Sequence, residues 1–168
     1  MYQNQTYHNP FTPPRTPRAL LHHLINAPQR YNAHDESTLW DQTYASVTTG
    51  RLSRDDLQEA VLWAARRFSA AASEQLHRNL AANLNSADGL AVGELTSCWA
   101  FHQEWSWRFA CLPHLIAVLR SEGGCVGLFL GIRELVEWTR AVGEGLVLMR
   151  GEGVVGGGLD GWNGYVYV

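Results

Sequence analysis

Two cysteine–histidine pairs are the residues whose types most suggest chemistry. Cys98 precedes His102, and Cys111 precedes His114, so the four side chains are of the kinds that bind zinc. One helix through this region would place Cys98 and Cys111 about 20 Å apart along its axis, whereas each ligand must lie within about 2.3 Å of the ion. The spacing therefore predicts buried thiols and hydrogen-bonded histidines, with no metal site and no cofactor.

A glycine pattern near the end of the sequence has the form of a dinucleotide-binding fingerprint. Gly151-x-Gly153-x-x-Gly156 follows a possible strand, but such a loop binds pyrophosphate only where it opens a helix inside a βαβ unit. Residues 157–168 are rich in glycine and show no helical pattern. The pattern therefore indicates a turn and not a nucleotide site.

Two groups of carboxylates could serve as acid–base pairs, namely Asp55, Asp56 and Glu59, and Glu134 and Glu137. Neither group has a histidine at helical spacing, and both fall where a helix normally meets solvent. We therefore expect solvated helix surfaces and assign no catalytic residue. Enzymes whose mechanism needs a lysine are also excluded, because all 13 basic residues are arginine. Together these features favour a protein that is not an enzyme.

The charge and the cysteine content of the chain limit its partners. A net charge of -3 and scattered arginines give no attraction to nucleic acid. Three cysteines, an odd number in apolar surroundings, are typical of reduced thiols in an intracellular protein, either cytoplasmic or nuclear. No apolar run approaches the 20 or so residues that a membrane span needs. We expect the partner to be another protein, or a second copy in a homodimer.

Residues 1–18 form a predicted flexible arm, because they contain prolines and polar residues but almost no aliphatic side chains. Asn9-Pro10-Phe11 matches a tripeptide that endocytic adaptor domains bind. Pro10-x-x-Pro13-x-Arg15 has the spacing of polyproline ligands that dock on aromatic grooves. Phe11, Pro13 and Arg15 are therefore candidate partner-binding residues, although the prolines alone could serve to keep the arm extended.

Thr12 and Thr16 each precede a proline and are candidate phosphorylation sites. Thr16 also begins the first predicted helix, because a hydroxyl followed by proline is typical of a helix N-terminus. That helix should stop near Pro28. The bundle domain is predicted to cover residues 19–142.

The sequence predicts an all-α bundle of about five to six helices around an apolar central helix at residues 95–120. One helix opens at Asp35 and stops before Gly50, and a longer one begins after a capping box formed by Ser53 and Asp56. The central helix carries large apolar residues on one side: Cys98, Phe101, Trp105, Phe109, Leu112, Ile116 and Leu119. Arg108 is placed on its polar flank, and Pro113 is expected to kink it.

The last predicted helix includes Val126, Phe129, Leu130, Leu135 and Trp138. It is apolar nearly all round in its first two turns, so we expect it to be interior. Residues 143–168 form a glycine-rich C-terminal segment in which short runs of β-branched and aromatic residues indicate a small β-hairpin.

Seven tryptophans suggest that this bundle is a protein–protein interaction or regulatory module, since tryptophan is enriched at interface anchors. Trp107 and Trp162 are the candidate anchors, because Trp107 lies on the flank of the central helix and Trp162 in the glycine-rich tail. The alternative is a small enzyme or ligand-binding bundle, with a pocket near Trp99, His102, Trp107 and Cys111.

Asp160-Gly161-Trp162 resembles the late Gly-Trp element of the apoptosis-regulator bundles, in which amphipathic helices surround an apolar central helix. The Asn-Trp-Gly-Arg type of signature of that family is absent from the sequence. The resemblance implies a helical bundle that binds a partner helix, and fold analogy alone supports this third alternative.

Overall fold

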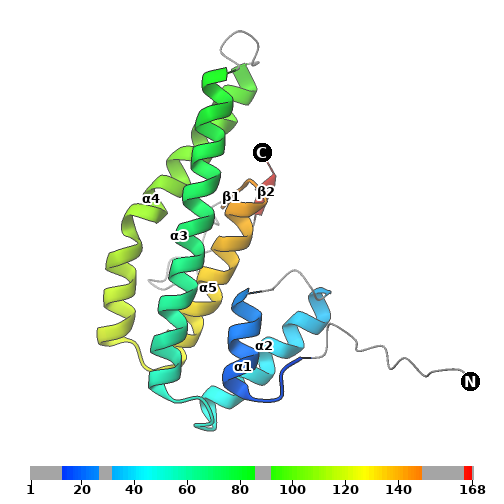
Figure 1. Cartoon of the computed structure of the whole chain (residues 1–168), viewed down its shortest axis with the longest axis vertical. Coiled ribbons are helices and arrows are strands. Elements are labelled where there is room, and N and C mark those ends of the chain that lie inside the picture. The colour runs from blue at the N-terminus through cyan, green and yellow to red at the C-terminus, as the bar shows by residue number, and fades with distance from the viewer. Residues whose placement is uncertain (1–12, 27–31, 86–91, 149–164, 168) are drawn as a thin grey trace, which may run out of the picture.

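The structure is a computed structural model that describes residues 13–26, 32–85, 92–148 and 165–167, with side chains for 13–26, 32–78 and 100–145. The described residues form an all-α bundle with a short two-stranded ribbon (Figure 1). The elements in chain order are α1 (Pro17–Asn26), α2 (Ala33–Thr48), α3 (Arg54–Asn85), α4 (Val92–Glu122), α5 (Cys125–Gly143), β1 (Leu146–Leu148) and β2 (Tyr165–Tyr167).

The helix ends lie close to where the sequence predicts them. The Thr16 hydroxyl accepts a hydrogen bond from the backbone N–H of Ala19 at 3.2 Å. Asp56 accepts bonds from the N–H and the hydroxyl of Ser53 at 3.0 and 2.8 Å, and its own N–H donates to Ser53 Oγ at 3.1 Å. Gly50, which follows α2, has a φ of 75°. These contacts satisfy backbone groups that the helices leave unpaired, so the predicted caps are confirmed.

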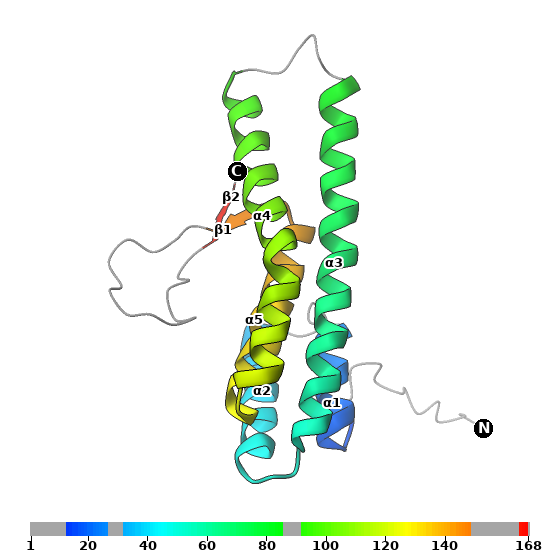
Figure 2. The same cartoon turned by 90° about the vertical axis from the view of Figure 1, so that its left-hand side faces the viewer.

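α5 is the central helix of the bundle, and the prediction that residues 95–120 would occupy this place is wrong. α5 contacts all four other helices and β1, and its most extensive partner is α3. α4 lies at the side of the α3–α5 pair (Figures 1 and 2). α4 carries polar residues through much of its surface, whereas α5 is more apolar and can be covered from several directions.

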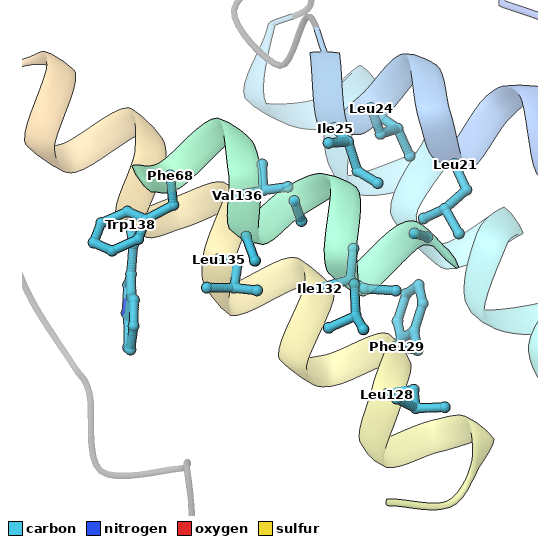
Figure 3. Packing of buried hydrophobic residues seen from close by; sticks show 14 of the residues in the cluster. Leu21, Leu24, Ile25, Phe68, Leu128, Phe129, Ile132, Leu135, Val136 and Trp138 are labelled. Carbon is cyan, nitrogen blue, oxygen red and sulfur yellow. The ribbon is translucent and has the colours of Figure 1, made fainter. Parts of the chain in front are cut away.

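The core forms where α1, α2, α3 and α4 meet α5. Phe68 of α3 lies between two tryptophan rings, with centroid distances of 5.9 Å to Trp105 and 5.5 Å to Trp138. Phe129, near the start of α5, contacts Trp40 edge to face at 5.9 Å. Figure 3 shows this apolar contact continuing from Trp138 along α5 to Leu128. Aromatic pairs stabilise a fold beyond the apolar area that they bury, and they do so only in certain ring geometries. These pairs therefore favour one alignment of the helices.

α3 and α4 continue as an antiparallel pair beyond the end of α5 (Figure 2). β1 follows α5, contacts α4 and α5, and pairs with β2 in an antiparallel register that places Leu148 opposite Tyr165. Residues 149–164 of the predicted hairpin segment lie outside the described residues. The ribbon therefore meets the bundle at the C-terminal end of α5.

One expectation for α4 needs correction. Phe109 is 41% exposed, although Phe101, Trp105, Leu112 and Leu119 of the same predicted stripe are buried. Helical spacing placed Phe109 near the apolar side, but the neighbouring helices cover only part of that side. Pro113 lies inside α4 and does not end it. Pro113 is exposed, so water can hydrate the carbonyl that its missing N–H leaves unpaired.

We predict that Phe129→Ala lowers the free energy of unfolding by about 3 to 5 kcal/mol, because Phe129 is 1% exposed and its removal leaves a cavity. Phe109→Ala, the matched variant on α4, should cost less than about 1 kcal/mol. Urea unfolding of both variants measures these changes. Equal losses in the two variants would contradict this assignment of core and surface.

We also predict that Ser53→Ala costs about 1 kcal/mol, because it removes the cap hydroxyl of α3. The hydrogen bonds from Ser53 hold the pKa of Asp56 below its ordinary value. The stability that ionised Asp56 contributes is fully present above its pKa in the unfolded chain. It is lost as the pH falls through its lower pKa in the folded protein. The cost of Ser53→Ala, measured by thermal unfolding, should therefore shrink in acid; a cost that does not change with pH would count against the capping box.

Candidate interaction surface

Arg108 is a fully buried cation between α4 and α5. Its side chain is 0% exposed and donates to Glu104 Oε1 from Nε at 3.0 Å and from Nη2 at 2.8 Å. Its guanidinium lies 5.5 Å from the Trp105 ring centroid and 4.7 Å from that of Trp138. Helical spacing predicts Arg108 on the polar flank of α4, and this prediction is wrong. The signal that could have indicated burial is Glu104, four residues earlier and in position to pair with it.

Glu134 of α5 faces the same cluster. Its carboxylate accepts a hydrogen bond from Trp138 Nε1 at 2.8 Å, and Arg108 attracts its negative charge. Burial raises the pKa of Glu134, and this effect outweighs the hydrogen bond and the nearby arginine. Glu134 is partly buried, so the prediction that it lies on a solvated surface is wrong. A carboxylate, a cation and two indoles thus join α4 to α5.

A second ion-pair group joins α2 to α5. Arg140 donates to Glu36 Oε1 from Nη2 at 2.5 Å and to Glu137 Oε1 from Nη1 at 3.5 Å. Glu36 also accepts a weaker bond from Trp40 Nε1 at 3.4 Å. Because each cation already lies against a carboxylate, the two groups act chiefly as links between helices. α5 therefore makes charged contacts with α4 through the Arg108 group and with α2 through the Arg140 group.

Seven large apolar side chains are exposed in the described residues. From helical spacing and from the contacts of their neighbours, we infer that five of them, on α2, α4 and α5, point away from α3: Tyr44, Trp107, Val118, Val126 and Leu130. We call these five residues the outer α4–α5 face. The other two are Trp63 of α3 and Phe109 of α4.

The position of this face follows from helix periodicity and from one close contact. Trp107 and Val118 are 11 residues apart, close to three helical turns, so they point to the same side of α4. A Cβ atom on Gly131 would lie 2.6 Å from Leu119 Cδ1, so α4 and α5 approach closely there. Val118 and Leu130 precede these two residues in the sequence, and both are exposed. Tyr44 borders α5 from α2, where its ring lies 5.6 Å from that of Phe129.

The α5 part of this face was not predicted from the sequence. Val126 and Leu130 were expected to be interior, but they are 40% and 43% exposed. A helix that is apolar all round needs neighbours on every side, and the exposure of these two residues shows that the other helices do not cover this side of α5. Arg133, also exposed, lies on this side one turn after Leu130, with its guanidinium 5.8 Å from the Trp40 ring centroid.

The predicted site residues are not brought together into one site. Trp107, expected to be exposed, is 51% exposed, the largest value among the exposed apolar residues. Pro13 and Arg15 are exposed and lie just before α1, while Thr16 caps that helix. Phe11, Thr12 and Trp162 lie outside the described residues, and so does the Asp160-Gly161-Trp162 element.

The pocket considered near Trp99, His102, Trp107 and Cys111 does not follow from this geometry. His102 and Cys111 are nine residues apart on one continuous helix, which places them on opposite sides of α4. The side chains of Cys98 and Trp99 lie outside the described ones. Among the described residues, no group of three His, Cys, Asp or Glu side chains could hold a metal ion.

Comparisons with known proteins give this chain no relatives. No protein-family model matches the sequence, and neither the curated proteins nor the solved structures contain a match. Of the helices in the described residues, none combines the length and the apolar character needed to cross a membrane. The class of the protein is therefore defined by its fold alone, as an all-α bundle.

We predict that the free energy of unfolding of Glu134→Gln increases relative to that of the wild type as the pH rises from about 4 to 7. The folded pKa of Glu134 lies above its ordinary value of 4.5, so wild-type stability from this group is present at low pH and is lost as the pH rises. Glutamine does not titrate and can still accept the bond from Trp138. Urea unfolding at several pH values measures the difference.

Glu122→Gln, a substitution at an exposed position, is the matched control and should show no such trend. If the difference between Glu134→Gln and wild type stays constant with pH, the carboxylate does not titrate with a raised pKa.

Proposed function

We propose that this chain is a non-catalytic protein–protein interaction module that binds its partner through the outer α4–α5 face. The support for this is that helical spacing assigns five of the seven large apolar side chains exposed in the described residues to that face, and that Trp107 is the most exposed of the seven. Large apolar side chains that cluster on a surface are typical of binding sites, and tryptophan is enriched among the residues that dominate binding energy.

Charged groups near the face would set the orientation of a partner. Arg133 lies on the exposed side of α5 next to Leu130, and Glu137 follows four residues later on the same side. An apolar centre with charged groups around it is the usual arrangement of protein interfaces. The partner is either a different protein or a second copy of this chain, and a second copy would form an isologous dimer.

We predict that Trp107→Ala weakens partner binding at least about 30-fold, because an anchor tryptophan contributes about 2 kcal/mol or more. Leu130→Ala should weaken the same association, and thermal unfolding should change little because both side chains are largely exposed. Trp63→Ala and Phe109→Ala are the matched controls, since they remove exposed aromatic rings outside the face. The affinity of these two control variants for the partner should remain close to that of the wild type.

Light scattering over a range of concentrations first tests whether the protein self-associates. If it does, the dimerisation affinity is measured for the wild type and for the four variants. If the protein stays monomeric, a photo-crosslinking residue at position 130 identifies the partner, with position 63 as the control. The affinity of that partner is then measured in the same variants. Equal binding by face and control variants, or equal crosslinking at positions 130 and 63, would contradict the proposal.

A further inference from the structure

A hollow of about 480 Å³ lies where the segment before α1 passes the C-terminal end of α2. Its charged lining residues are Arg15 and Arg51, and no carboxylate lines it. Thr16, Gln42 and Thr49 add polar groups, and the remaining lining includes prolines and Leu20. The hollow therefore combines two positive charges with neutral polar and apolar walls in a chain whose net charge is -3.

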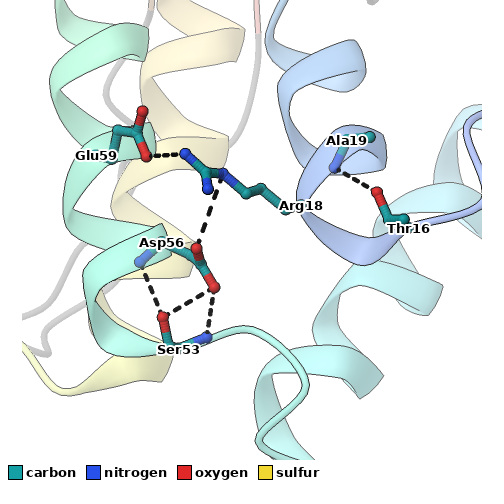
Figure 4. Close-up of polar contacts among 6 residues, drawn as sticks. All are labelled: Thr16, Arg18, Ala19, Ser53, Asp56 and Glu59. Atoms are coloured by element: carbon teal, nitrogen blue, oxygen red, sulfur yellow. Dashed lines mark hydrogen bonds and ion pairs between the residues drawn. The ribbon is translucent and has the colours of Figure 1, made fainter.

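Arg15 and Arg51 differ from most other described arginines in lacking a partner. Arg18 pairs with Asp56 and Glu59 (Figure 4), and Arg108 and Arg140 pair with glutamates as described above. Within the described residues, neither Arg15 nor Arg51 makes an ion pair or a side-chain hydrogen bond. Two like charges that line one hollow without a counter-charge favour an anion between them.

We propose that this hollow binds a phosphoryl group held by Arg15 and Arg51, independently of the proposed interaction function. The planar guanidinium presents paired N–H donors that match two phosphate oxygens, and such charge-assisted bonds are stronger than neutral ones. The Gln42 amide supplies a further donor in the lining.

The phosphoryl group has two possible sources that share this chemistry. One is a phosphate ester on Thr16, which is exposed, lines the hollow and precedes Pro17. The Thr16 oxygen already accepts from the Ala19 N–H, as Figure 4 shows, so an ester there would keep its phosphate beside the hollow. The other source is a free phosphate compound. The two sources are distinguished by two arms of one experiment.

The first arm titrates inorganic phosphate into the full chain at low ionic strength and follows the amide NMR signals of Arg15, Thr16 and Arg51. Arg15→Gln and Arg51→Gln should each weaken binding about tenfold through the loss of a charge-assisted hydrogen bond. Arg66→Gln removes the same charge from an exposed position on α3 outside the hollow and should leave binding unchanged. All three arginines are exposed, and circular dichroism verifies that the variants fold.

The second arm uses the full chain with phosphothreonine at position 16 and follows the phosphate by ³¹P NMR. Arg15 and Arg51 should lower its second pKa below the ordinary value of about 6, because they favour the dianion. Arg51→Gln should raise this pKa again, whereas Arg66→Gln should not change it.

A response in the first arm alone assigns the hollow to a free phosphate compound, and a response in the second alone assigns it to modified Thr16. Responses in both arms show that either source can fill it. If neither arm depends on Arg15 and Arg51, or if Arg66→Gln has an equal effect, phosphate is an adventitious ion only and the proposal is wrong.

Discussion

The burial of α5 against α3 is the constraint on which the rest of the structure depends. Residues Leu128, Ile132 and Leu135 of α5 are 0% exposed, and so are Leu57, Val61 and Phe68 of α3. Complete burial of such side chains contributes about 1.5 to 3 kcal/mol each, so this pair forms the main apolar contact of the bundle. The other helices then cover the sides of α5 that α3 does not reach.

The ion-pair groups determine how α2 and α4 are placed around that contact. Arg108 lies against two indole rings and a glutamate, and Arg140 spans from α5 to Glu36 of α2. A buried charge costs free energy unless its partners are well placed, so each group favours one alignment of its helices. We therefore expect the charged contacts to contribute to the specificity of the arrangement.

The same arrangement leaves two different surfaces. The four other helices do not cover the apolar α5 on all sides, so Val126 and Leu130 remain exposed, as do Val118, Trp107 and Tyr44. The hollow with Arg15 and Arg51 lies elsewhere, at the junction of α1 with the end of α2. Arg18, which ties α1 to α3 through Asp56 and Glu59, holds α1 close to this junction (Figure 4). A partner protein and a phosphoryl group could therefore be bound at separate places.

The sequence alone determined the features that depend on contacts within a few residues. The caps at Thr16 and Ser53 and the left-handed Gly50 are predicted correctly, because the start and the end of a helix are local properties. The exposure of Trp107 was also predicted, since it lies off the apolar stripe of its own helix. These features indicate an all-α bundle before any tertiary contact is known.

Only the tertiary structure decided which helix is central, which charges are buried and which apolar residues stay exposed. Arg108 and Phe109 are neighbours whose burial is the reverse of what their residue types favour, because burial depends on helices distant in the sequence. Helical periodicity gives the sides of a helix, but it does not say how many neighbours will cover each side. The outer α4–α5 face and the arginine hollow arise from that packing, so they could be found only in three dimensions.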